Sequence, residues 1–583
     1  MRRSAESRSE WRAARATLMP ALKQCRGRLL FAIALGLGAR WVFLPLPFLL
    51  RRLLRQESAE LSAGALTVWG LTWPELALVG LLLLACLRLG LVWGQKVASE
   101  RAAQTAIAFL RQRMMDHLMR LKLSYFDQRA AGKVVLRFVS DANAIKSFLG
   151  TTLVNLSADL PTILAIMVLL FFIQWQVALI ACTGIPIALL IFWRLNPELR
   201  ARTRLARKRQ AALCNHLTQR LWTIEEIKAN RAEAVEATIG GSLIDSVADA
   251  NVRRARINGV LSGVTAGLFT AALALVVWLG GRLTMTGDLA VPDLVAFLLL
   301  CSFMQGPIRR CSASNAGFQR AQVALERIHA FMIRPLEPDA ASPSLQLRVV
   351  GRQVKVSDLS FQYHSTAPWV FNGLNLKIDG PGLVVLEGPT GVGKSTLFAL
   401  ILRLRRPQAG SVAVDGVSLR RVSVASVRRQ IGWLPQEVRL LPGTVAENVR
   451  YGCPDLSDAQ VEEWLSRTMP VNGLEAPRLS GANTVSEFGR NLSPVQRVQV
   501  GLARALATGP RVLLLDDPTA HMGLADEDAL RALIDELRSE TLIIAASSRP
   551  WLLEAADQRI DLALVDGTCP ENSGSVGDGV ASS

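Results

Sequence analysis

The chain lacks the cysteine pairs that would define a metal centre or a disulfide scaffold. Its eight cysteines, at positions 25, 86, 182, 214, 301, 311, 453 and 569, include no C-x-x-C pair, and several lie inside apolar runs. Cysteines in such surroundings behave as small apolar residues, in a core or facing lipid. We therefore expect neither a zinc site nor a disulfide framework.

Charged residues are also scarce. They make up 20% of the 583 residues, against 50% hydrophobic residues, and the apolar residues are concentrated in the first half of the chain. This points to lipid as part of the solvent. The formal net charge of +18 would suit a nucleic-acid binder, but the lysines and arginines flank apolar runs instead of lying on aromatic-bearing sheets or basic helices. The positive-inside bias of membrane proteins explains the same total, so we expect no nucleic-acid partner.

Six apolar segments are long enough to cross a bilayer as helices. A hydrocarbon core of about 30 Å requires roughly 20 helical residues, because no water is present to satisfy an open backbone. The first segment is too long for the apolar region of a cleaved signal peptide, so we expect it to remain as a membrane helix. Only Gln174 and its neighbours separate the third and fourth segments, which predicts a tight hairpin. The predicted spans lie near 29–50, 76–94, 153–173, 175–193, 257–279 and 289–308.

The two long connectors of this bundle are predicted to be cytoplasmic. They follow the second and fourth spans, and each has about 60 residues with on the order of ten or more lysines and arginines. Both termini should then be cytoplasmic too. Arg51, Arg52 and Arg55 are an exception, because this topology places them outside. Apolar residues recur at helical spacing through both connectors, so the helices should continue out of the membrane.

A proline-rich stretch, RPLEPDAASPS, marks a domain boundary after the sixth span. Beyond it, short β-rich runs alternate with helical stretches, which is the pattern of an α/β domain. We predict a cytoplasmic N-terminal segment over 1–27, an all-α six-helix transmembrane domain over 28–334 and a linker over 335–345. An α/β domain should follow over 346–567, in which the octapeptide GPTGVGKS predicts a P-loop NTPase, and a disordered tail should follow over 568–583.

The clearest chemical motif is a phosphate-binding loop. The octapeptide GPTGVGKS follows the apolar run GLVVLE and opens an apolar helix, as G-x-x-x-x-G-K-[ST] requires. Its glycines let backbone N–H groups surround phosphates, its lysine neutralises them, and its serine offers a hydroxyl to Mg²⁺. A structural glycine turn would not explain the lysine. We expect ATP and Mg²⁺ to bind, with these nucleotide-binding residues: Gly388, Pro389, Thr390, Gly391, Val392, Gly393, Lys394, Ser395 and Thr396.

Two carboxylates end the apolar run RVLLLDD downstream. A buried strand in this position would deliver acids to the metal. Asp516 would then help to hold Mg²⁺ together with Ser395, and Asp517 would orient the attacking water as general base. Alone, such a run is as often a helix cap, but about 120 residues after a phosphate loop it forms the second half of one site.

At this point the chain resembles the ATP-binding cassette (ABC) transporters, in particular exporter-type half-transporters. Segments similar to that family include FQYH, WLPQE, LSPVQ, and LSYFDQRAAGKVVLRFVSDANAI and TIEEIKANRAEA in the two connectors. The resemblance implies that two cassettes dimerise around two ATP molecules and move the membrane helices. It also implies that Tyr363 stacks on adenine, against the alternative of a half-buried strand tyrosine, and that Gln436 touches Mg²⁺ and the membrane domain. Four residues would face the partner's ATP: Ser493, Pro494, Val495 and Gln496.

Four departures from the family pattern predict slow hydrolysis. Asp517 replaces a glutamate, which moves the base by roughly 1.5 Å, and a misplacement near 1 Å can cost about a hundredfold in rate. Ser547 and Ser548 stand where a histidine is usual, and Gly523 stands where an aspartate is typical. Pro494 and Val495 replace two signature glycines, which removes a backbone donor and adds a Cβ near the γ-phosphate. The alternative is that an active ATPase tolerates all four changes.

Two arginines lie inside apolar spans, where a charge is costly and usually faces a cavity or a partner. Arg40 and Arg88 are therefore candidate substrate-cavity residues for an anionic substrate. Alternatively, Arg88 extends toward the cytoplasmic interface and Arg40 bonds backbone carbonyls near the prolines at 45 and 47.

Three functional hypotheses follow. The first is a half-transporter that exports a lipid, peptide, drug-like molecule or metabolite across a prokaryotic plasma membrane. The second is import of a small ligand through the same fold. The third is a regulatory subunit that binds ATP without hydrolysing it. The partner is a second copy or, as the favoured reading, a different half-transporter, with membrane lipid around both.

Overall fold

A computed structural model describes residues 2–52, 73–127, 131–337, 349–364, 366–468, 479–520 and 522–569. The predicted linker and tail lie mostly outside these ranges, as does Arg55. The chain divides into two compact units. The first comprises Met1–Met115 and Val134–Ile333, and the second comprises Asp116–Lys133 and Arg334–Ser583. A short piece of the first connector therefore groups with the C-terminal unit.

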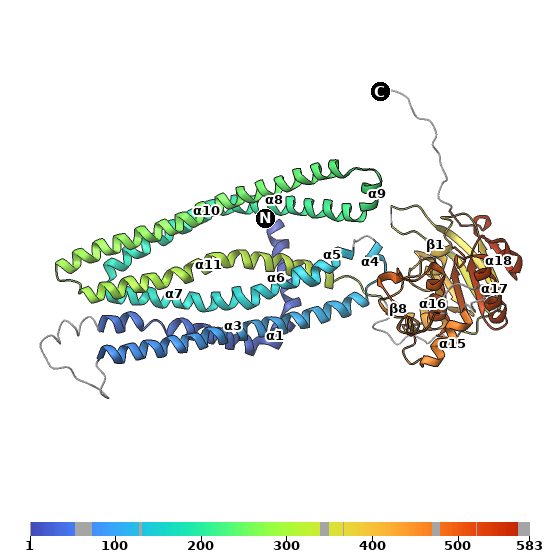
Figure 1. Ribbon diagram of the computed structural model, residues 1–583, viewed down its shortest axis with the longest axis horizontal. Helices are drawn as coiled ribbons and strands as arrows, with labels where there is room; N and C mark the ends of the chain where they lie inside the picture. Colours follow the sequence, from blue (N-terminus) through green and yellow to red (C-terminus); the bar gives the residue numbers. More distant parts are fainter. Residues whose placement is uncertain are drawn as a thin grey trace, which may run out of the picture. The chain divides into compact units, whose positions relative to one another are not determined.

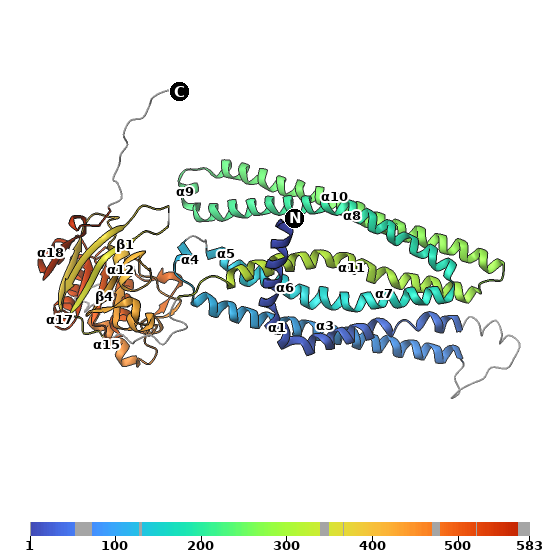
Figure 2. The ribbon, with the colours of Figure 1, turned by 180° about the vertical axis from the view of Figure 1, so that it is seen from behind.

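The first unit is built from long helices (Figures 1 and 2). These are α1 (Arg2–Trp41), α3 (Trp73–Met119), α5 (Ala131–Leu136), α6 (Ala142–Ser147), α7 (Val154–Ile173), α8 (Trp175–Trp222), α9 (Ile224–Ala229), α10 (Glu233–Met285) and α11 (Val291–Met332). Two π-helical segments, Arg137–Asp141 and Phe148–Leu153, link α5, α6 and α7. The helices run well beyond the predicted spans, which confirms that the connectors continue the membrane helices.

The hairpin predicted at Gln174 is present, because this residue alone is extended (φ −159°, ψ 103°) between α7 and α8. Both views show α8 and α10 running side by side, joined through α9 at one end (Figures 1 and 2). Buried apolar residues from α7, α8, α10 and α11 form a shared core that includes Leu170, Val177, Val276 and Phe297.

Five stretches of the described residues are long and apolar enough to cross a membrane: Ala16–Arg52, Leu78–Met119, Val134–Ile173, Glu233–Met285 and Val291–Met332. The remaining predicted span, 175–193, lies within α8. Large apolar side chains such as Leu83, Phe172 and Trp278 are exposed on these helices. Exposure of this kind suits contact with lipid and not with water.

Arg51, an exception in the predicted topology, has a partner. Its guanidinium pairs with the carboxylate of Asp293 in the first turn of α11. A residue at the end of the first apolar span thus meets the start of the last one. This ion pair offsets part of the free energy needed to remove the arginine charge from water at that end of the bundle.

The second unit is an α/β domain with three sheets. An antiparallel sheet has the order β2-β1-β4-β5, a parallel sheet the order β11-β3-β10-β9-β6, and β7 pairs with β8. The strands are β1 (Gln353–Phe361), β2 (Phe371–Asp379), β3 (Gly382–Glu387), β4 (Ala409–Val414), β5 (Val417–Ser418), β6 (Ile431–Leu434), β7 (Gly443–Thr444), β8 (Thr484–Val485), β9 (Val512–Asp516), β10 (Leu542–Ala546) and β11 (Gln558–Asp561).

The larger helices of this unit are α12 (Lys394–Ile401), α13 (Val424–Gln430), α14 (Val445–Val449), α15 (Asp458–Thr468), α16 (Pro494–Leu506), α17 (Leu524–Leu537) and α18 (Pro550–Ala555). Of these, α12, α13, α16 and α18 contact strands of the parallel sheet, and α14 and α15 pack on α16. The short helix α4 (Ser124–Asp127) also belongs to this unit. Successive residues of β9 enter two different cores: Leu514 packs with the cluster that contains β1 and α12, and Leu515 with the cluster that contains α16 and α17. Burial on both faces explains why this strand is continuously apolar.

Candidate nucleotide site and the ion cluster of the membrane helices

The parallel sheet brings the predicted nucleotide-binding segments to one edge. Leu386 of β3 lies opposite Ala546 of β10, and Ala546 lies opposite Asp516 of β9. On the next strand, Leu434 of β6 lies opposite Leu515. The loops after β3, β10, β9 and β6 therefore all leave at the carboxyl edge, which is where ligands bind in open α/β sheets.

The phosphate loop has the backbone that its glycines require. Gly388, Gly391 and Gly393 have φ values of 135°, 90° and 109°, a region that other residues rarely adopt. A Cβ at Gly393 would lie 2.7 Å from the ring of Phe371, so a side chain there would also clash. Gly393 directly precedes α12 and is its N-cap. Backbone N–H groups can therefore converge on an anion at the start of this helix.

Lys394 keeps its charge available for a ligand. Its Nζ donates to the carbonyl oxygens of Gly388 at 2.5 Å and Pro389 at 3.1 Å, both within its own loop. In the part of the chain that the structure describes, no carboxylate lies within ion-pair distance of this amine. The positive charge is held over the loop, where terminal phosphates would lie.

Asp516 is suited to a metal ion. It is buried at the end of β9, and burial raises the pKa of its carboxyl, to which the neighbouring charge of Asp517 adds. A hydrogen bond with Ser395 and the charge of Lys394 lower the same pKa. A cation beside these oxygens would favour the ionised carboxylate. The set contains few protein ligands, as is usual for Mg²⁺, which takes most of its shell from phosphates and water.

Asp517 has a left-handed backbone, with φ of 49°. Its N–H donates to the carbonyl oxygen of Ala546 at 2.9 Å, which ties the end of β9 to β10. Aspartate adopts this conformation more readily than most residues. Ser547, one of the two serines where a histidine is usual, is buried after β10, and its hydroxyl accepts from the N–H of Arg549 at 3.2 Å.

Tyr363 follows β1, and Gln436 follows β6. The Tyr363 hydroxyl is 2.9 Å from the Thr396 hydroxyl in the first turn of α12, so the ring lies beside the phosphate loop. The tyrosine remains 42% exposed, which leaves ring surface for a base. Gln436 is exposed two residues after β6, the neighbour of β9.

The four signature residues lie at the N-terminus of α16. Ser493 is its N-cap: the Ser493 hydroxyl accepts from the N–H of Gln496 at 3.1 Å, and the Gln496 side chain accepts from the N–H of Ser493 at 2.9 Å. Pro494 occupies the first turn, where its missing N–H costs the helix nothing. Val495 packs against the neighbouring apolar cluster. The helix is therefore well capped by its own residues.

The two arginines of the apolar spans have different surroundings. Arg40 Nε donates to Asp159 at 2.5 Å, Nη1 to the Gly36 carbonyl at 2.8 Å and Nη2 to Asn155 at 3.1 Å. Acceptors within the protein thus satisfy the Arg40 guanidinium. The carbonyl it bonds precedes it by one turn and does not lie near the prolines at 45 and 47. Arg88 is exposed, with its guanidinium carbon 4.2 Å from the ring centroid of Phe43.

Two further residues, Asp159 and Arg310, complete the Arg40 cluster and were not predicted from the sequence. Asp159 is fully buried on α7, and Arg310 of α11 donates to it through Nε at 2.8 Å and Nη2 at 2.9 Å. Asp159 lies inside the apolar run 153–173, and a charge at that depth is as costly as that of Arg40. Its position in the sequence could therefore have marked it as a candidate. One carboxylate therefore joins α1, α7 and α11.

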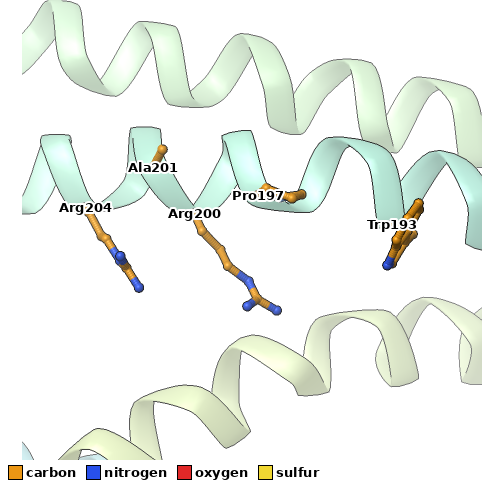
Figure 3. A pocket seen from close by; sticks show the side chains of 5 residues that line it. All are labelled: Trp193, Pro197, Arg200, Ala201 and Arg204. Atoms are coloured by element: carbon orange, nitrogen blue, oxygen red, sulfur yellow. The ribbon is translucent and has the colours of Figure 1, made fainter. Parts of the chain in front are cut away.

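A hollow of about 330 Å³ lies along α8, lined by Trp193, Pro197, Arg200, Ala201 and Arg204. Figure 3 shows these five side chains. The two arginines and the tryptophan lie on the side of α8 that faces away from α10. The hollow begins at the C-terminal end of the predicted fourth span, 175–193, and continues beyond it along α8. Its residues were not predicted as a site.

Fold and site together define a P-loop ATP-binding domain on the same chain as a multi-pass membrane domain. The family model of the ABC transporter transmembrane region matches residues 29–308, and that of the ABC transporter cassette matches residues 371–520. The chain belongs to the ABC transporters, as an exporter-type half-transporter that couples ATP to transport.

Similar proteins agree with this assignment. The chain is 26% identical over 486 residues to an ATP-dependent lipid A-core flippase of Chromobacterium violaceum, covering 83% of this chain and 82% of that protein. It is 30% identical over 457 residues to a multidrug efflux ATP-binding/permease protein of Mycobacterium bovis, covering 78% of this chain and 38% of that longer protein. A bacterial Atm1-family ABC exporter with ATP bound has the same fold, with a TM-score of 0.79, 21% identity and coverage of 93% of this chain and 95% of that one.

Proposed function

We propose that this chain is one half of an exporter with an impaired ATPase: its signature weakens the site that holds the partner's ATP, and Asp517 weakens the site that holds its own. The observation that carries the proposal is the signature segment. Ser493 and Gln496 cap each other, Pro494 has no N–H to offer, and Val495, partly buried, packs against the apolar core. A γ-phosphate on a partner cassette would meet few free donors at this helix.

Asp517 weakens the other composite site, the one built on this chain's own phosphate loop. Its carboxylate is one methylene shorter than that of glutamate, and the backbone at φ 49° fixes where the side chain begins. ATP and Mg²⁺ would still be held, because Lys394, Ser395, Asp516 and Gln436 are in place. Binding is therefore retained while the positioning of water is weakened.

We further propose that the functional dimer is heterodimeric, with a second half-transporter whose own cassette carries the glutamate and the histidine that are missing here. ABC exporters function as dimers, and two copies of this chain would have two weakened sites. In that dimer the chain could also act as a regulatory subunit, because its phosphate loop is intact and its hydrolytic residues are not. We place the cassette and both termini in the cytoplasm of a prokaryotic cell, on the basis of the basic connectors.

Export is the direction we propose, since the relatives are named as a flippase and as an efflux protein. The same names make a lipid or a drug-like molecule the first substrates to test. Basic residues along α8 would suit a substrate with an anionic group.

The test is the ATPase rate of the purified full-length chain in lipid nanodiscs. We expect turnover well below the 1 s⁻¹ or so that marks the lower end of common enzymes. Asp517→Glu should raise the rate, by up to about a hundredfold if position 517 alone is limiting. If only the double variant Pro494→Gly with Val495→Gly raises it, the signature is limiting.

Lys394→Ala is the background control for both variants. Substantial turnover in the unmodified chain that disappears only with Lys394→Ala would show that the four departures are tolerated. In that case the proposal of a weakened site is wrong.

A further inference from the structure

The side chain of Arg405 lies between the connector helix α4 and the ring of Tyr363. Arg405 follows α12, and its guanidinium makes two parallel hydrogen bonds with the Asp127 carboxylate of α4, one of them 2.6 Å long. Its central carbon lies 5.2 Å from the centroid of the Tyr363 ring. Only 12% of the Arg405 side chain and 24% of the Asp127 side chain are exposed. This is a shielded ion pair with an aromatic ring as its third member.

The Tyr363 ring is fixed by three different contacts. Its hydroxyl bonds with Thr396, its edge meets Phe361 at a centroid distance of 5.2 Å and an angle of 75°, and Arg405 lies against it. Removing one contact leaves the other two, so the protein would still fold. The orientation of the ring would however be less restricted, and stacking on a base depends on that orientation.

We propose that Arg405 is a positioning residue for the nucleobase, and that Asp127 of the connector thereby sets how tightly the base is held. The inference rests on the proposed nucleotide site and adds a residue to it. The bidentate carboxylate holds the planar guanidinium in one orientation, and the guanidinium in turn holds the ring. The contribution of the nucleobase to ATP binding should therefore depend on Asp127, which lies 278 positions before Arg405 and outside the cassette sequence.

A second ion pair in the same unit provides the comparison. Glu337 forms two hydrogen bonds with Arg428, of 3.2 and 2.6 Å, and their side chains are 27% and 33% exposed. Arg428 also donates to the carbonyls of Leu402 and Arg403. This pair joins the segment after α11 to the cassette without an aromatic ring, so it tests what docking alone contributes.

The experiment compares a nucleotide with a ligand that has no base. Binding of radiolabelled ATP with Mg²⁺ is measured by equilibrium dialysis on the full-length chain in lipid nanodiscs, and Mg²⁺-tripolyphosphate is measured by competition. Asp127→Asn should raise the ATP dissociation constant about two- to fivefold, the range of one cation–π contact. The tripolyphosphate constant should not change. Glu337→Gln should leave both constants unchanged.

Two further variants separate positioning from docking. Arg405→Lys keeps the charge but loses the bidentate geometry, so it should weaken ATP alone, and it serves as the test if Asp127→Asn fails to fold. The double variant Asp127→Arg with Arg405→Asp restores an ion pair but places no cation on the Tyr363 ring. Its affinity for ATP should therefore remain lower than that of the unmodified chain.

If the dissociation constants of ATP and tripolyphosphate rose equally, the ion pair would support the cassette as a whole and the inference would be overturned. Unchanged ATP binding would overturn it as well. A parent chain that binds neither ligand would instead refute the nucleotide site itself.

Discussion

The membrane helices and the sheet edge of the cassette both contain charged residues, but they use them differently. In the membrane unit, Asp159 is completely buried and receives hydrogen bonds from both Arg40 and Arg310. At the sheet edge, the bonds that Lys394 makes among the described residues go to carbonyls of its own loop. Where water is absent, the protein supplies the counter-charge itself, whereas at the ligand edge it leaves the charge for a phosphate.

A charged residue in an unexpected place can therefore either neutralise another residue of the protein or bind a charged ligand. Arg40 was a candidate for contact with an anionic substrate, but its three donor groups already have protein acceptors. Lys394 was a candidate for contact with phosphate, and it has no carboxylate partner among the described residues. The variants below test this distinction, beginning with the largest expected effect.

Asp159→Asn should be the most damaging single change, because it leaves two arginines in the membrane helices without a carboxylate. Breaking a buried ion pair from one side costs about 3–5 kcal/mol. The measurement is the fraction of folded protein after heating in detergent, followed by fluorescence-detected size-exclusion chromatography.

Glu198→Gln is the matched control for that variant, since Glu198 pairs with Arg202 at 3.4 Å on an exposed surface of α8. It should cost less than about 0.5 kcal/mol. If the two variants were equally stable, the buried cluster would not be a stabilising element.

Lys394→Ala should lower ATP affinity by about 10- to 100-fold, the range for hydrogen bonds to a charged group. Stability without nucleotide should not change, because this lysine supports only its own loop. Equilibrium dialysis and the heating assay give the two readouts. Lys355→Ala, an exposed lysine of β1, should change neither. A loss of stability comparable to that of Asp159→Asn would remove the distinction between the two regions.

Arg310→Gln should destabilise less than Arg40→Gln. The Arg310 side chain is 45% exposed and that of Arg40 is 13% exposed, and either variant leaves one arginine on Asp159. We expect roughly 1–2 kcal/mol for Arg310, reduced by its exposure, and more for Arg40. The heating assay ranks the two. The reverse order would mean that Arg310 is the main partner of Asp159.

Arg88→Met should have the smallest effect, about 0.5–1 kcal/mol, because the exposed guanidinium contributes mainly a cation–π contact with Phe43. Combining it with Phe43→Leu should add less than the sum of the two single changes if the contact is real. Strict additivity in the heating assay would show that the two side chains do not interact.

Much of the fold could be predicted from local patterns. The hairpin at Gln174, the helical connectors and the α/β cassette are confirmed. Each of them could be predicted from the spacing of apolar residues or from a break in that spacing. Arg51 at the outer end of the first span counted against the predicted topology. The partner that explains it, Asp293, lies 242 positions later and could not be inferred from the spacing of apolar residues.

The phosphate loop was determined by the sequence alone, because eight consecutive residues carry its glycines, its lysine and its serine, and backbone geometry follows from neighbours in the chain. The partners of Arg40 and Arg405 were decided only by the tertiary structure. Asp159 and Asp127 lie on other helices, and ion pairs between distant segments depend on packing, which no local period records. Short-range conformational preferences thus specified where a ligand is held, while long-range packing specified which charges remain free to hold it.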